Sequence, residues 1–120
     1  MKNILGTTLI SCSFDPLTGF FRNGYCQTDE MDRGSHVVAS VMSKEFLRFT
    51  KSMGNNLSTP NLTYNFPGLQ PGDRWRLCAL RWKEAYDIGS APFVILEATH
   101  EKALDYIDLS ALLEMRYVEN

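Results

Sequence analysis

Three residues in the first third of the chain, Cys26, Asp32 and His36, are of the types that carry nucleophilic catalysis. A cysteine attacks as its thiolate, which a neighbouring base or positive group must favour. His36 could be that base and Asp32 could orient its imidazole, because Gly34 lets the chain turn between them. The structural alternative is that Asp32 caps a turn and His36 begins a strand. Whether the protein is an enzyme therefore stays open.

A second set, Asp73, Arg74 and Trp75, could bind an anionic or planar ligand. Arginine offers a flat fork of hydrogen-bond donors, and tryptophan offers a face on which a planar group stacks. The competing interpretation, which we favour, is a structural salt bridge beside a tryptophan of the core.

A third set, Glu97, Thr99 and His100, follows an apolar run that reads as a strand. Ligands collect at the carboxyl ends of parallel strands, and helix N-termini attract anions. A histidine at such a place could act as an acid or base near neutral pH. The alternative is that Thr99 only caps a helix and His100 lies on the surface.

The thiol and imidazole groups of the chain do not form a metal motif. Structural zinc sites use thiolates and imidazoles at close spacing, and no two such residues here have that spacing. We therefore predict neither a metal nor another cofactor, and an odd number of cysteines argues against a disulfide framework. The residues concerned are Cys12, Cys26, Cys78, His36 and His100.

Length and composition indicate one globular domain spanning residues 1–120, with 44% hydrophobic and 22% charged residues. The net charge of −2 and the lack of a basic cluster argue against nucleic acid as a partner. No segment is long and apolar enough to span a membrane, and the N-terminus lacks the apolar core of a signal peptide. A cytoplasmic protein of undetermined oligomeric state is predicted.

The first half of the chain predicts a hairpin, a strand and a helix. Asn23-Gly24 suits the two-residue turn of a hairpin over residues 19–28. The valine-rich residues 36–42 predict a strand. Ser43 can cap the helix that follows, and Gly54 can end it in the left-handed conformation. The apolar stripe of that helix comprises Met42, Phe46, Phe49 and Met53.

The second half begins with a long polar loop at residues 55–71, in which Pro67-Gly68 and Pro71-Gly72 predict turns. A strand starts near Arg74, with Trp75, Leu77 and Ala79 on one face and Arg74, Arg76 and Cys78 on the other, nearer water. Further helices follow, one stopped by Gly89, one capped by Thr99 and one by Asp108 or Ser110. The continuous apolar run at residues 93–96 predicts a central strand covered on both faces.

These elements predict an α+β fold. The sheet would be small and mixed, with an N-terminal hairpin and three to four helices packed on it. The spacing between the strand at Arg74 and the run at residues 93–96 is just sufficient for a parallel crossover. Residues far apart in the sequence would then meet along one rim of the sheet.

Sequence blocks covering about residues 5–113 resemble a family of small proteins named domain of unknown function 2237. The blocks, in order, are "CSFDPLTGFFRNGYC", "DRGSHVV", "EFLRF", "GNNLSTP", "FPGLQPGDRWRLCALRWKEA" and "APFVILEATHEKAL". The resemblance implies a bacterial-type intracellular domain and no particular activity. Ala39 and Arg76 depart from the family pattern, in which many relatives carry cysteine, so a thiol cluster using those positions cannot form here.

The favoured functional hypothesis is binding of a small polar or anionic molecule in a pocket at the sheet edge. The loop at residues 55–71 would wall this pocket. Its polar groups would be His36, Arg74, Glu97 and His100.

The alternative hypothesis is a non-catalytic protein-interaction or oligomerisation module. Such a module would expose an apolar patch. The best candidates for that patch lie on the predicted hairpin, namely Phe20, Phe21 and Tyr25.

Overall fold

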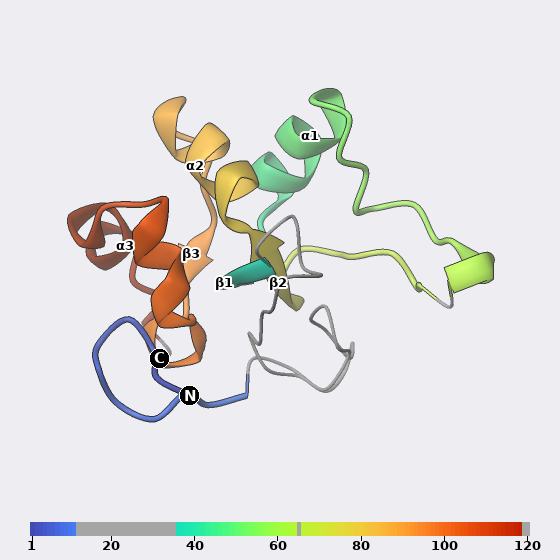
Figure 1. Cartoon of the computed structure of the whole chain (residues 1–120). Helices are drawn as coiled ribbons and strands as arrows, with labels where there is room; N and C mark the ends of the chain where they lie inside the picture. The colour runs from blue at the N-terminus through green and yellow to red at the C-terminus, as the bar shows by residue number, and fades with distance from the viewer. Residues whose placement is uncertain (12–35, 65, 119–120) are drawn as a thin grey trace.

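A three-stranded sheet organises the part of the chain that the computed structural model describes, residues 1–11, 36–64 and 66–118 (Figure 1). The strands β1 (His36–Val41), β2 (Arg74–Cys78) and β3 (Phe93–Val94) lie in the order β2-β1-β3. Both strand pairs are antiparallel, so β2 and β3 run in the same direction with β1 between them. The α+β class is confirmed, but the described sheet is antiparallel rather than mixed. The parallel crossover was expected to place β3 next to β2, whereas β1 lies between them.

Three α-helices surround the sheet, α1 (Lys44–Ser52), α2 (Ala79–Asp87) and α3 (Leu109–Glu114). Helix α2 packs on β1 and β2 and also contacts α1. Short 3-10 helices η1 (Leu62–Tyr64), η2 (Leu96–Ala98) and η3 (Glu101–Asp105) complete the described elements, and η2 and η3 contact β1. No helix among the described residues has the length and apolar character needed to cross a membrane.

The ends of α1 confirm the predicted signals. The Ser43 hydroxyl accepts a hydrogen bond from the Phe46 backbone N–H at 3.1 Å, which satisfies a donor that the first turn leaves open. Gly54 follows the helix with φ of +89°. Phe46 is fully buried, whereas Met53 at the far end of the predicted stripe is 47% exposed. The stripe therefore anchors the first turns of α1 on the core more firmly than the last.

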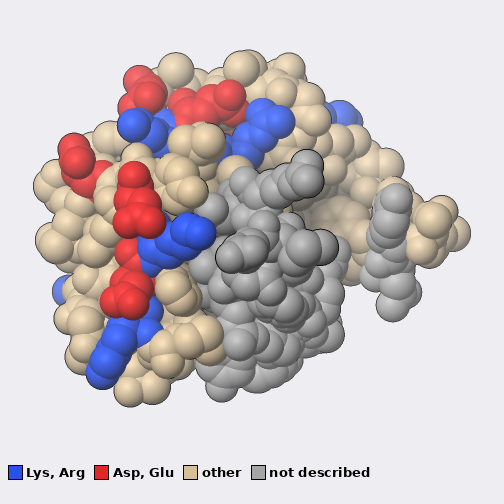
Figure 2. Space-filling view, viewed as in Figure 1, with Lys and Arg blue, Asp and Glu red and all other residues tan. Residues whose placement is uncertain are grey.

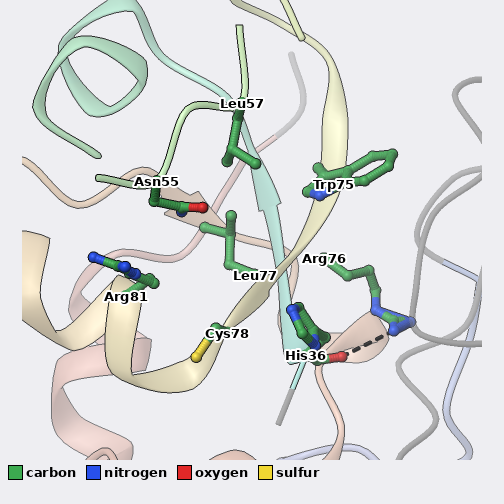
Figure 3. A pocket seen from close by; sticks show the side chains of 8 residues that line it. All are labelled: His36, Asn55, Leu57, Trp75, Arg76, Leu77, Cys78 and Arg81. Atoms are coloured by element: carbon green, nitrogen blue, oxygen red, sulfur yellow. Dashed lines mark hydrogen bonds between the residues drawn. The ribbon is translucent and has the colours of Figure 1, made fainter. Parts of the chain in front are cut away.

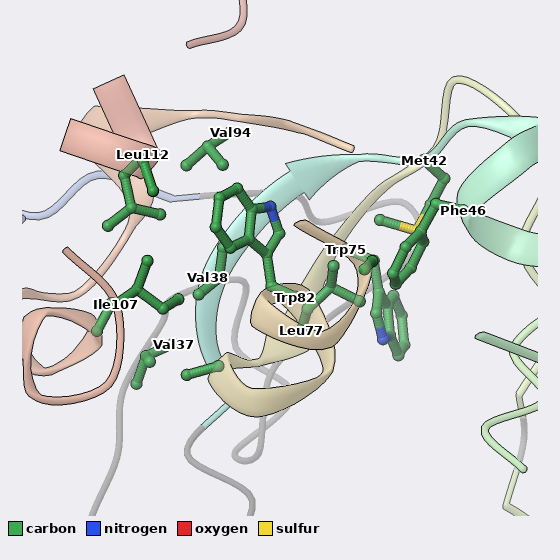
Figure 4. Packing of buried hydrophobic residues seen from close by; sticks show 14 of the residues in the cluster. Val37, Val38, Met42, Phe46, Trp75, Leu77, Trp82, Val94, Ile107 and Leu112 are labelled. Carbon is green, nitrogen blue, oxygen red and sulfur yellow. The ribbon is translucent and has the colours of Figure 1, made fainter. Parts of the chain in front are cut away.

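The main hydrophobic core lies between one face of the sheet and the helices (Figure 4). Trp82 of α2 sits at its centre with no exposed surface, and its indole N–H donates to the Pro92 carbonyl at 3.1 Å. Leu112 of α3 and Val94 of β3 belong to the same cluster. A smaller cluster covers the other face, built on Leu9, Ala39, Ile95 and Ala98. The sheet is thus covered on both faces, with β1 as its central strand.

The prediction of a central strand at residues 93–96 is wrong. Only Phe93 and Val94 form a strand, Phe93 is 53% exposed, and the chain then turns into η2. Val94 donates its N–H to the Met115 carbonyl and accepts from Tyr117, so the C-terminal segment lies along its other side. The apolar run is continuous because it supplies both a short strand and a buried turn, and burial alone does not distinguish the two.

Thr99 does not cap the following helix as predicted. Its buried hydroxyl donates to the Ile95 carbonyl at 3.0 Å and accepts from the Ala39 N–H at 3.1 Å, tying η2 to β1. The cap of η3 is His100, whose Nδ1 accepts from the Lys102 N–H at 3.0 Å. A buried hydroxyl needs hydrogen-bond partners, and the Ala39 N–H and the Ile95 carbonyl supply them to Thr99. The Thr99 hydroxyl therefore does not serve as the cap of η3.

The predicted long loop at residues 55–71 extends away from the sheet, and we refer to its described residues, 55–64 and 66–71, as the arm (Figure 1). Asn61 and Phe66 pair through two backbone hydrogen bonds, and Leu69 donates to the Leu57 carbonyl at 2.8 Å. The predicted turns are confirmed, with φ of +80° at Gly68 and +95° at Gly72. The predicted hairpin at residues 19–28 lies outside the described residues.

Candidate functional site

A pocket of about 260 Å³ lies along β2, the outermost strand on one side of the described sheet (Figure 3). Its walls come from the start of β1, from β2, from the base of the arm and from the first turn of α2. It lies at the edge of the described sheet, beside the arm. The lining residues are His36, Asn55, Leu57, Trp75, Arg76, Leu77, Cys78 and Arg81.

Strand β2 supplies half of the wall through alternating side chains. Trp75 and Leu77 point to the main core and are 7% and 2% exposed. Arg76 points to the opposite face, as the alternation predicted, but it is only 1% exposed and not near water. Its Nη2 donates to the His36 carbonyl at 2.9 Å. Residues distant in the sequence cover that face. The alternation of side chains therefore predicted that the strand has two faces, but it could not show that both faces are buried.

The base of the arm supplies Asn55 and Leu57, and local hydrogen bonds hold both in place. The Asn55 side-chain amide donates to the Thr50 hydroxyl at 2.9 Å, and the Leu57 carbonyl accepts from Leu69 at 2.8 Å. Phe66 of the arm packs edge-on against Trp75, with ring centroids 5.4 Å apart. The arm therefore positions one wall of the pocket through contacts made by both its outgoing and its returning segment.

Arg81 supplies the cationic group at the α2 side of the pocket. Its Nη1 donates to the Met53 carbonyl at 3.1 Å and to Glu84 Oε1 at 3.3 Å. These contacts fix the guanidinium between the end of α1 and the first turns of α2. The ion pair with Glu84 is partly exposed, so solvent weakens its hold on the guanidinium charge.

The pocket lining is electropositive. The described residues of the lining include two arginines and a histidine and no aspartate or glutamate. The face in Figure 2 is mixed in charge, because lysines and arginines lie among aspartates and glutamates there. The local excess of positive charge in the pocket differs from the net charge of −2 of the whole chain. A concave site with this lining favours anions.

His36 and Cys78 are Cα partners in the register of β1 and β2, beside a bulge between His36 and Val38. Both line the pocket, and Cys78 is the residue that precedes α2. The predicted catalytic set paired His36 with Cys26 and Asp32, which lie outside the described residues together with Cys12. The juxtaposition of His36 and Cys78 was missed because it depends on strand pairing between residues far apart in the sequence.

The structure does not bring the predicted set Asp73, Arg74 and Trp75 together at the pocket. Trp75 lines the pocket, whereas Asp73 and Arg74 do not. The Asp73 carboxylate accepts from the Gln70 N–H at 2.9 Å and closes the turn before β2. The Arg74 guanidinium lies 5.8 Å from the centre of the Tyr117 ring, on the other side of the strand from the main core.

The predicted set Glu97, Thr99 and His100 lies beside β1 and the N-terminal segment, and none of the three lines this pocket. The His100 N–H donates to the Val37 carbonyl at 3.0 Å, and the Glu97 carbonyl accepts from the Asn3 side chain at 3.1 Å. Of the four polar groups expected to share one pocket, His36 lines it and Arg74, Glu97 and His100 do not. The predicted apolar patch of Phe20, Phe21 and Tyr25 lies outside the described residues.

Metal-ligating side chains do not gather in the described parts of the chain. No group of three or more histidine, cysteine, aspartate or glutamate residues there is arranged to hold an ion. Cys78 is a free thiol of intermediate exposure.

His100 makes the stability of the fold depend on pH. Burial lowers the pKa of His100 below its usual 6.5, and the N-terminal amine, Lys102 and Arg76 lower it further against an opposing effect of Glu101. The folded protein thus favours neutral His100, whose Nδ1 accepts the capping bond. As pH falls below 6.5, the unfolded chain takes up the proton first, so stability from this group is lost as pH falls through the lowered pKa.

We therefore expect the free energy of unfolding to fall between pH 7.5 and pH 5, and to fall less in His100→Asn. Asparagine caps a helix but does not titrate, so it serves as the matched control. Urea denaturation at both pH values measures the difference. Equal losses in the wild type and in His100→Asn would contradict this assignment.

Comparisons with known proteins place the chain in a family without assigning it an activity. A search of curated proteins finds no significant match. A family model described as "Uncharacterized protein conserved in bacteria (DUF2237)" matches residues 2–116, which is nearly the whole chain. The residues that form the described pocket all fall within the match. The chain therefore belongs to this family of uncharacterised bacterial proteins, domain of unknown function 2237.

Proposed function

We propose that this protein binds a small anionic or polar molecule in the pocket along β2. The observation that carries the proposal is the described part of the lining, which combines Arg76, Arg81 and His36 with no carboxylate around a volume of about 260 Å³. Ligand sites typically join an apolar wall to a few fixed polar groups, and here Leu57, Trp75 and Leu77 lie beside polar and cationic side chains. A cytoplasmic setting, where small anions are abundant, is part of the proposal.

The chemistry of the lining favours a carboxylate or phosphate group on the ligand. Arg81 is fixed through one of its terminal nitrogens, and a guanidinium can pair with an oxyanion through two parallel hydrogen bonds. Trp75, Leu57 and Leu77 offer an apolar wall for the carbon skeleton. The volume suits a molecule smaller than a drug-sized ligand.

Arg81→Gln tests the proposal. We expect it to weaken binding of the best anion in a panel of monocarboxylates, dicarboxylates and inorganic phosphate. A hydrogen bond to a charged group contributes about 1.5–3 kcal/mol, which corresponds to roughly a ten- to hundredfold loss of affinity. Isothermal titration calorimetry at low salt measures the change.

Lys83→Gln is the matched control, because Lys83 is an exposed cation on the same helix and does not line the pocket. It removes the same net charge, so its affinity should stay close to that of the wild type. Equal weakening in both variants would show only a general charge effect. Absence of binding across the whole panel would overturn the proposal.

A further inference from the structure

We propose that the pocket along β2 selects small carboxylates that carry a hydroxyl group on the neighbouring carbon, with Arg81 binding the carboxylate and Asn55 the hydroxyl. The inference rests on the proposed function, because it concerns the ligand of the same site. It adds a second recognition group and narrows the ligand from any small anion to a 2-hydroxy acid.

Asn55 contributes a hydrogen-bond acceptor whose orientation is fixed at the end of α1. Its backbone N–H donates to the Thr50 carbonyl at 2.8 Å, and its side-chain Nδ2 donates to the Thr50 hydroxyl at 2.9 Å. Thr50 is fully buried, so it holds the amide from the side of the core. Figure 3 shows the side-chain oxygen of Asn55 directed toward Leu57 and Leu77 of the pocket wall. This oxygen accepts no hydrogen bond from the described residues, so it is available to a ligand.

Arg81 contributes hydrogen-bond donors beside Asn55. Its Nη1 donates at 3.1 Å to the carbonyl of Met53, which is two residues before Asn55. Because consecutive Cα atoms are only about 3.8 Å apart, this bond places the guanidinium near the Asn55 side chain, as Figure 3 shows. The hydrogen bonds that Arg81 makes with described residues use Nη1, so Nη2 and Nε are available to a ligand.

The two groups together require more of the ligand than negative charge. A carboxylate pairs with a guanidinium through its oxygens, but it has no proton to donate to the Asn55 oxygen. An anion without a donor would bring an acceptor toward an acceptor and displace the water that satisfies Asn55, which lowers affinity. The arrangement therefore favours a ligand that presents a carboxylate and a hydrogen-bond donor close together.

A hydroxyl group suits this donor position better than an ammonium group. The ammonium of an amino acid would lie near the Arg81 guanidinium, and like charges close together repel. A hydroxyl is neutral and can donate to the Asn55 oxygen. Because Asn55 and Arg81 are neighbours in the pocket, the hydroxyl belongs on a carbon close to the carboxylate, as in a 2-hydroxy acid.

Pairs of acids that differ by one hydroxyl test the proposal, namely glycolate against acetate and lactate against propionate. Both members of a pair carry one negative charge at pH 7.5, so the charge of the ligand is constant within the pair. Titrations followed in ¹H–¹⁵N spectra measure the dissociation constants. The hydroxy acid should bind about three- to tenfold more tightly than its partner, as one added neutral hydrogen bond predicts.

Variants assign the preference to Asn55. Asn55→Ala removes the acceptor and should make the two affinities of each pair nearly equal. Asn61→Ala is the matched control, because Asn61 is an exposed asparagine of the arm that does not line the pocket, and it should keep the preference. Arg81→Gln should weaken both members of a pair by a similar factor and leave their ratio close to that of the wild type.

Equal affinities within both pairs for the wild type would overturn the inference and leave the proposed function standing. This comparison needs no variant, so it decides the matter even where a substitution unfolds the protein. A preference that survives Asn55→Ala, or that Asn61→Ala abolishes equally, would also overturn the inference. Absence of binding by all four acids overturns it as well, and absence of binding across the whole anion panel overturns the proposed function with it.

Discussion

Trp82→Ala is expected to lower the free energy of unfolding by about 3–5 kcal/mol, the usual cost of removing a buried aromatic side chain. Trp82 has no exposed surface and lies at the centre of the main core. Its ring stacks on Tyr86 with centroids 5.2 Å apart, and its N–H is satisfied by the Pro92 carbonyl. The substitution removes the side chain that holds α2 against the sheet. Urea denaturation monitored by circular dichroism measures the loss.

Trp82→Phe separates packing from hydrogen bonding at the same position. Phenylalanine keeps an aromatic ring in the core but leaves the Pro92 carbonyl without its donor, which costs about 1–3 kcal/mol. We therefore expect Trp82→Phe to be less destabilising than Trp82→Ala. A loss below about 1 kcal/mol for Trp82→Ala would contradict the placement of α2 over the core.

Gly68→Ala is expected to be the most disruptive change in the arm. A Cβ at position 68 would lie 2.6 Å from the Ser58 carbonyl oxygen and 3.1 Å from the Pro60 nitrogen. These neighbours belong to the backbone of the facing segment of the arm, so they cannot move aside as a flexible side chain could. The φ of +80° adds about 1–2 kcal/mol for any residue with a Cβ.

Gly72→Ala is the matched control for the arm. Its φ is +95°, yet a Cβ there would meet nothing within 4 Å. The backbone strain is thus shared by the two variants and the clash belongs to Gly68 alone. We expect Gly68→Ala to be less stable than Gly72→Ala by about 1–3 kcal/mol in thermal or urea denaturation. Equal effects of the two substitutions would contradict the close approach of the two segments of the arm at Gly68.

Local signals in the sequence predicted the features that depend on neighbouring residues. Ser43 caps α1 because its hydroxyl needs only the N–H of Phe46, and Gly54 ends that helix because only the local backbone decides its φ. The start of β2 and the turns at Gly68 and Gly72 follow from the same kind of information. In each case the interaction spans only a few residues, so the neighbouring sequence is sufficient to predict the local conformation.

Features that depend on distant residues could not be predicted in this way. Thr99 has the residue type of a cap, but its hydroxyl bonds to Ala39 of β1, sixty positions away. Arg76 has the residue type of a surface strand position, but it is buried. The pairing of His36 with Cys78 depends on the register of two strands.

The indole N–H signals of the two tryptophans offer the most direct test of anion binding in the pocket. Trp75 lines the pocket, whereas Trp82 is enclosed in the core and bonded to Pro92. In ¹H–¹⁵N spectra recorded while the best anion of the panel is added, the Trp75 signal should shift with saturation and the Trp82 signal should stay in place. Trp82→Phe assigns the two signals. A Trp75 signal that stays fixed at saturating anion, or that moves only in step with Trp82, would contradict the pocket as the binding site.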